Sequence, residues 1–222
     1  MKPTLALPFV LGLLLALPAG VHAQTPKQIQ WQDLAPRVSA SDDPFAKLSR
    51  DQLVTLSDVA ATRERKAMGD KGISADDLAR EQAGTKRLQQ EGLDVDALLA
   101  KRRELAKQRK AQGETLIAAL DGQTVRLPGY VLPLEITGKK VTEFLLVPWV
   151  GACIHTPPPP PNQIVHVKAD APFEVTSLFA PVWVTGRLAA GATKRELTLL
   201  DGSSDIDVGY TVRASRIEPF KE

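Results

Sequence analysis

The chain gathers its scarcest reactive side chains, one cysteine and two of its three histidines, in a single stretch. Cys153 is the only cysteine, and His155 and His166 follow it closely. A thiolate and a neutral imidazole are ligands that both zinc and copper accept. The three residues therefore predict a zinc or copper site, which leaves a position open for water, for cargo or for a carboxylate such as Glu135.

The spacing of Cys153 and His155 leaves two other interpretations open. In an extended segment the two side chains share a face, with their Cα atoms about 6.5 Å apart, so His155 could hold Cys153 as a catalytic thiolate. Such a nucleophile needs a third group to orient the histidine, and Asn162 or Gln163 could serve. In the other interpretation the motif is structural, and the thiol is a small buried hydrophobe. Glu135 and Glu143 are otherwise expected to be ordinary residues of the surface or of the barrel rim.

A run of five prolines, Pro157–Pro161, separates these side chains from the segment that carries His166. Proline fixes φ near −65° and donates no backbone hydrogen bond, so the run favours a polyproline II rod of about 15 Å. A stiff connection of this kind fixes the position of the residues that flank it. The two nearby tryptophans, Trp149 and Trp183, fall within apolar strand patterns and are expected in the core.

The motif Gly151-Ala-Cys-Ile-His155, with the prolines and Asn162-Gln163 after it, resembles that of an uncharacterised bacterial family of exported proteins, a domain of unknown function. The segments 129–135 and 181–186 resemble the outer motifs of the family, and the resemblance covers about residues 115–220. It implies a periplasmic protein or lipoprotein that is often encoded near transporter genes. A membrane transporter or another periplasmic protein is therefore an expected partner.

The first 23 residues have the pattern of a secretory signal peptide. Lys2 gives a positive start, Phe9–Leu17 an apolar stretch, and Val21-His-Ala23 suits cleavage after Ala23. The apolar stretch is far shorter than the ~20 residues that span a membrane, and no later stretch approaches that length. We therefore expect a periplasmic protein without a transmembrane segment after cleavage. No cysteine stands at the cleavage point, so a lipid anchor is not expected.

Composition and local patterns divide the mature chain into three parts. Charged residues make up 24% of the chain and the formal net charge is +2, a balance that does not indicate nucleic-acid binding. Residues 24–48 are irregular, with an apolar cluster that we expect to anchor on the main body. Residues 49–113 form a charged helical region whose helices begin after the capping residues Ser49, Ser74 and Asp94.

Residues 114–222 change to short apolar strands separated by turns, which predicts a small β-barrel. Pro128 is expected to interrupt the first strand. The fold class is α+β, an N-terminal helical arm followed by an OB-like antiparallel β-barrel. Taken together, these features favour an exported periplasmic accessory protein that binds a metal ion or a partner and is associated with a transport system. The alternative is a thiol-dependent enzyme that uses Cys153 and His155, although a non-enzymatic role is favoured.

Overall fold

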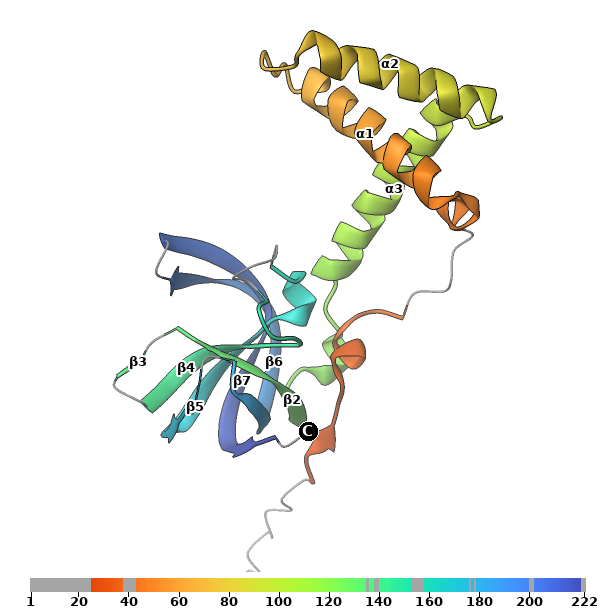
Figure 1. Ribbon diagram of the computed structural model, residues 1–222. Helices are drawn as coiled ribbons and strands as arrows, with labels where there is room; N and C mark the ends of the chain where they lie inside the picture. Colours follow the sequence, from red (N-terminus) through yellow and green to blue (C-terminus); the bar gives the residue numbers. More distant parts are fainter. Residues whose placement is uncertain are drawn as a thin grey trace, which may run out of the picture.

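A computed structural model describes the placement of most of the chain after the N-terminal segment. The described residues are 25–37, 43–134, 136–137, 140–152, 158–175, 177, 179–199 and 202–220. They form three α-helices and a closed β-barrel of five strands, so the protein is α+β and contains a barrel (Figure 1). The signal peptide expected at residues 1–23 lies outside the described part.

The helices occupy the positions that the capping residues predicted. They are α1 (Arg50–Ala67), α2 (Ala75–Gln90) and α3 (Val95–Glu114). The side chains of Ser49, Ser74 and Asp94 each accept a backbone hydrogen bond at the start of their helix, which satisfies a donor that the helix leaves free. The helices bury a small cluster of their own, made of Leu56, Val59, Ala60, Leu88, Val95 and Leu99. No helix in the described part is long and apolar enough to cross a membrane.

Five strands close the barrel by pairing β2 with both β6 and β4. The strands are β2 (Thr124–Pro133), β4 (Lys140–Val147), β5 (Val165–Glu174), β6 (Pro181–Leu199) and β7 (Gly202–Pro219). The ring runs β2-β6-β7-β5-β4 and returns to β2, while β1 (Lys27–Gln28) and β3 (Ile136–Thr137) add at edges. Four pairings of the ring are antiparallel and one, β5 with β7, is parallel.

The parallel pairing corrects the antiparallel barrel expected from the sequence. A closed ring with an odd number of strands cannot alternate in direction throughout, so at least one neighbouring pair must be parallel. Here that pair is β5 and β7, because β6 lies between them in the chain and pairs with β7 as a long hairpin. The barrel is therefore mixed.

Pro128 does not interrupt its strand, contrary to the sequence prediction. It pairs with Trp183 in the middle of the β2–β6 ladder. On the other side of β2, β1 pairs at Val125 and Arg126 and β4 begins only at Tyr130. The carbonyl of Pro128 accepts a hydrogen bond from the indole of Trp31 instead, at 2.8 Å. A proline is tolerated here because no described strand requires the missing N–H.

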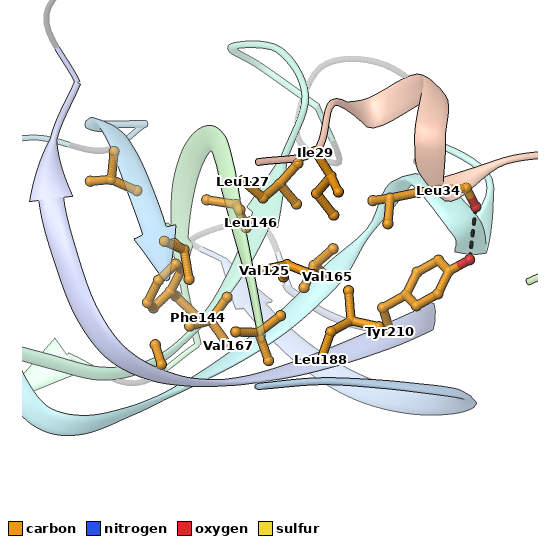
Figure 2. Close-up of a cluster of buried hydrophobic side chains, with 14 of the residues drawn as sticks. Ile29, Leu34, Val125, Leu127, Phe144, Leu146, Val165, Val167, Leu188 and Tyr210 are labelled. Carbon is orange, nitrogen blue, oxygen red and sulfur yellow. Dashed lines mark hydrogen bonds between the residues drawn. The ribbon is translucent and has the colours of Figure 1, made fainter. Parts of the chain in front are cut away.

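The barrel interior holds the main core (Figure 2). Alternate residues of each strand point inward, and Tyr210 contributes the largest fully buried side chain. The Tyr210 hydroxyl donates to the carbonyl of Leu34 at 2.8 Å, so the segment before the helices is fixed to the barrel, with Ile29 also buried in this core. The N-terminal apolar cluster is thus an anchor, as expected from the sequence. Full burial of a large apolar side chain such as Ile29 or Leu34 stabilises the folded state by about 1.5–3 kcal/mol.

A second apolar cluster lies on the opposite face of β4 and is covered by the β6–β7 hairpin. Phe144 and Leu146 belong to the main core, whereas Leu145 and Val147 belong to the second cluster; successive strand residues point to opposite faces. Its other buried members are Leu132, Ala152, Ile164, Leu197, Ile206 and Val208. We call this set the outer cluster. It exists because β6 and β7 continue their pairing as far as Leu199 and Gly202.

Neither tryptophan expected in the core is buried there. Trp149 follows the end of β4 and is 46% exposed. Trp183 is half-buried, with the guanidinium of Arg126 4.2 Å from its ring centroid and Phe220 in an edge contact at 5.4 Å. Both tryptophans lie in apolar sequence. For Trp183, contact with a cation at the surface stabilises the indole in place of burial in the core.

Candidate functional site

The structure describes only one of the three residues predicted to bind a metal. Cys153 and His155 lie outside the described residues, and so does Glu135. His166 is on β5, opposite Leu145 of β4, and its relative exposure is 0%. Because Leu145 belongs to the outer cluster, His166 lies on that same outer face, beneath the β6–β7 hairpin.

Both ring nitrogens of His166 are hydrogen-bonded to side chains. Arg195 on β6 donates from Nε to Nδ1 at 3.1 Å, and Nε2 lies 3.2 Å from Oε2 of Glu143 on β4. An arginine can only donate, so Nδ1 must be the unprotonated nitrogen. The proton is therefore on Nε2 and faces the carboxylate. Burial lowers the pKa of His166, and the positive charge of Arg195 lowers it further, so the neutral ring is the favoured form.

Glu143 is shared between His166 and Lys168. Its Oε1 lies 3.2 Å from the Lys168 ammonium, while its Oε2 bonds to the imidazole. Burial raises the pKa of Glu143, but the hydrogen bonds from Lys168 and His166 outweigh it and leave the pKa below the usual range. The carboxylate therefore stays ionised. Glu143 was expected to be an ordinary residue of the surface or the barrel rim; it is partly exposed, and it also orients a buried histidine.

This arrangement restricts what His166 can do as a ligand. A metal ion can bind His166 only if Arg195 or Glu143 releases its ring nitrogen, because no lone pair remains free. Within the described ranges, no three His, Cys, Asp or Glu side chains come together as a metal-binding group. The part that Cys153 and His155 would play in such a site stays a prediction.

The residues after the prolines join three parts of the molecule. Asn162 is only 1% exposed, and its amide nitrogen donates to the carbonyls of Gln112, at 2.8 Å, and Thr115, at 3.1 Å, at the end of α3. The amide nitrogen of Gln163 donates to the carbonyl of Trp31 at 3.0 Å. Both amides were candidates to orient a catalytic histidine. Their N–H groups bind backbone carbonyls, while an amide would orient a histidine through its oxygen, so that role stays a prediction.

The end of α3 also packs directly against the proline segment. A Cβ placed on Gly113 would overlap the ring of Pro160, so only glycine permits this approach. Pro159 is buried as well. The described part of the proline run, Pro158–Pro161, thus holds α3 against the barrel.

The chain leaves the barrel towards Cys153 through an exposed apolar pair. Trp149 and Val150 are 46% and 62% exposed, while Ala152 is buried in the outer cluster. Between them Gly151 has a φ of +82°, a conformation that residues with a Cβ rarely adopt. The segment that contains Cys153 therefore begins next to the outer cluster, on the face that carries His166.

Fold and site define a class: an α+β protein whose five-stranded mixed barrel is joined to three helices through a proline and asparagine junction. The chain belongs to the family described as Protein of unknown function (DUF3299), whose model matches residues 31–219. The match includes the helical region, which lies outside the 115–220 range of the sequence resemblance. The identification as an uncharacterised family is thus confirmed.

One solved structure aligns with most of this chain. It is the crystal structure of a DUF3299 family protein from Pseudomonas aeruginosa PAO1, 28% identical, and the alignment covers 89% of this chain and 98% of that chain with a TM-score of 0.47. No curated protein matches the chain.

Proposed function

We propose that this protein is an exported periplasmic accessory protein that binds a metal ion or a partner protein and has no catalytic activity of its own. The binding surface is formed by Trp149, Val150 and the Cys153–His155 segment, which we call the loop surface. The observation that carries the proposal is the exposure of Trp149 and Val150, at 46% and 62%, directly before the only cysteine. Adjacent exposed apolar side chains are typical of interaction surfaces.

The two amide residues after the prolines support this assignment, because their side chains already have partners within the fold. Asn162 and Gln163 hold α3 and the N-terminal segment through backbone carbonyls. The N–H groups of these two amides are used within the fold, so we assign recognition to the loop surface. The expected partner is a membrane transporter or another periplasmic protein.

We further propose that the barrel is of the OB type and that the helices form an arm beside it. The strand order supports the OB assignment. In chain order the barrel strands are β2, β4, β5, β6 and β7; the first, β2, pairs with the second, β4, and the fourth, β6. The third, β5, pairs in parallel with the fifth, β7. Figure 1 supports the helical arm, since α1 and α2 stand to one side of the barrel and α3 runs towards it. OB barrels commonly bind their ligands across one face and its loops.

For the metal-binding form of the proposal, Cys153 supplies a thiolate and His155 an imidazole to zinc or copper. His166 joins as a third ligand only when it releases Arg195 or Glu143. Thiolate and imidazole must both be deprotonated, so affinity falls as the pH drops through about 6.5, the ordinary pKa of histidine.

Two measurements test the loop surface. Metal analysis of protein isolated from its native periplasm asks whether zinc or copper is carried, and calorimetric titration of metal-free protein with zinc compares wild type with Cys153→Ser. We expect the variant to bind far more weakly, because it lacks the soft anionic ligand. Equal affinity in both proteins, or no binding in either, contradicts a metal site and leaves a partner protein as the ligand of the loop surface.

Labelling with iodoacetamide, with and without a chelator, separates this function from that of a thiol-dependent enzyme. Protection that the chelator removes supports a metal-bound Cys153. Rapid labelling that the chelator does not change supports the enzyme instead. N-terminal sequencing of the exported form tests the remaining point, and it should begin at Gln24.

A further inference from the structure

A groove runs along one face of α3. It consists of two hollows that meet at Arg109, which lines both of them. The first hollow lies between α1 and α3 and has an apolar floor of Phe45, Leu53, Leu56 and Leu105. The second lies where α3 meets the proline segment and is lined by polar groups, among them Arg37, Gln32 and Gln112. We call the two hollows together the α3 groove.

The α3 residues that line this groove form a single helical face. Arg102, Leu105, Arg109, Gln112 and Gly113 recur at spacings of three and four residues, which places them in one row along the helix. From the first to the last, the helix rises about 16 Å, at 1.5 Å per residue. An extended peptide of about five residues covers the same length.

The charges of the α3 groove are unbalanced. Arg102 forms an ion pair with Glu64 of α1. For Arg37 and Arg109, however, the described part of the chain supplies no ion pair. Among the described residues, Asp43 is the carboxylate that lines the groove, and it accepts the backbone N–H of Phe45 at 2.9 Å. Within the described part of the chain, the guanidinium groups of Arg37 and Arg109 therefore line the groove without an ion-pair partner.

The floor and walls of the groove are held in place by contacts already described. Asn162 fixes the last turn of α3 through the carbonyls of Gln112 and Thr115. The contact of Gly113 with Pro160 closes the end of the polar hollow. At the other end, Leu56 is buried in the helical cluster. A ligand would thus meet a formed surface, which reduces the entropy lost on binding.

We propose that the α3 groove binds an acidic peptide segment of a partner protein. An apolar side chain of the peptide occupies the hollow floored by Leu53 and Leu105, and one carboxylate pairs with Arg109. A second carboxylate, two residues further along the extended peptide, pairs with Arg37. Guanidinium and carboxylate form the two-pronged hydrogen bonds that make such pairs specific. This site is separate from the loop surface and does not depend on the function proposed for it.

Fluorescence anisotropy tests the proposal with the full mature chain and a labelled five-residue probe. The probe carries a phenylalanine followed, at alternate positions, by two glutamates separated by serines. Its control peptide replaces both glutamates by glutamine. We expect the acidic probe to bind about a hundredfold more tightly than the control, because each of the two charge-assisted pairs contributes about tenfold.

Two variants of the same helix locate the binding. Arg109→Gln should weaken binding of the acidic probe about tenfold. Arg103→Gln removes the same charge from an exposed position of α3 outside the groove and should change the affinity by less than about twofold. Thermal melting checks that both variants remain folded, and Cys153→Ser should bind the probe as wild type does.

Equal binding of the acidic and the glutamine peptide overturns the proposal, as does the absence of saturable binding. An equal loss in the Arg103 and Arg109 variants also overturns it, because it shows attraction to the general charge of α3. The Cys153→Ser variant separates this proposal from the one for the loop surface. Loss of metal binding in this variant leaves peptide binding unchanged, and absence of peptide binding leaves the metal measurement unchanged.

Discussion

Arg195 donates a hydrogen bond from Nε to Nδ1 of His166 at 3.1 Å and thereby ties the β6–β7 hairpin to the face of the barrel that it covers. The two residues belong to strands that are not neighbours in the barrel ring, β5 and β6. Glu143 on β4 completes the contact from the other side of the imidazole. One buried histidine therefore connects three strands and fixes how the hairpin lies on the outer cluster.

The first prediction concerns the protonation of His166 in metal-free protein. Because Arg195 can only donate, the ring should carry its proton on Nε2, and it should remain neutral at pH 6.5, where a free histidine is about half protonated. Burial and the Arg195 charge are the reasons, since both lower the pKa of His166. Nitrogen-15 NMR of the imidazole measures the tautomer and the titration directly.

The variant Arg195→Met is the control for that prediction. It removes the donor to Nδ1 and the nearby positive charge, so the pKa of His166 should rise, while the proton should stay on Nε2 because the Glu143 carboxylate still accepts it. A proton found on Nδ1 in the wild-type protein contradicts the assigned hydrogen bond.

The second prediction concerns the junction at Asn162. Asn162→Ala leaves the carbonyls of Gln112 and Thr115 without their buried donor, which should lower the free energy of unfolding by about 1–3 kcal/mol. Denaturant unfolding measures this loss. Gln89→Ala, at an exposed position of α2, is the matched control and should change stability by less than about 0.5 kcal/mol. A similar small change in Asn162→Ala contradicts the structural role.

The helices and most strands were predictable because their signals are local. Ser49, Ser74 and Asp94 stand directly before their helices, alternating apolar residues mark β2, and a continuous apolar run marks β4. The parallel β5–β7 pairing could have been expected from parity once five strands were assigned to a closed barrel.

The environment of His166 was not predictable in this way. Its partners Glu143 and Arg195 are 23 and 29 residues away in the sequence, and they meet only because the hairpin folds over the outer cluster. The predicted burial of Trp149 was wrong for a related reason. Nothing in the apolar run before this residue shows that β4 ends at Val147. Contacts between distant residues decide both cases, and periodicity carries no information about them.

The third prediction concerns the pH dependence of α2. Hydrogen bonds from the backbone and side chain of Ser74, together with one from Arg80, lower the pKa of Asp77 to about 2. A carboxylate with a lower pKa in the folded state stabilises at a pH above its unfolded value, about 3.9, and this contribution disappears as the pH falls towards 2. The protection of the amides in the first turn of α2, measured as the intrinsic exchange rate divided by the observed rate, should therefore fall between about pH 4 and pH 2.

The variant Asp77→Asn shows whether that carboxylate is responsible. Its first turn should exchange faster than wild type at neutral pH, and the difference should vanish near pH 2, where wild type has lost the charge as well. A difference that persists unchanged to pH 2 assigns the effect to the shape of the side chain and contradicts the prediction.

The last prediction compares two glycines of β6. At Gly186 the β6–β7 ladder shifts register, and a Cβ there would overlap the carbonyl oxygen of Arg213 on β7. Backbone cannot move aside as a flexible side chain can, so Gly186→Ala should lower the free energy of unfolding by at least about 2 kcal/mol.

At Gly191, further along the same strand, a Cβ meets nothing within 4 Å and φ is not positive. Gly191→Ala should therefore be neutral or stabilise by up to about 1 kcal/mol, because alanine narrows the unfolded ensemble. Denaturant unfolding of both variants measures the contrast, and equal stability of the two would show that the strands do not approach each other this closely at Gly186.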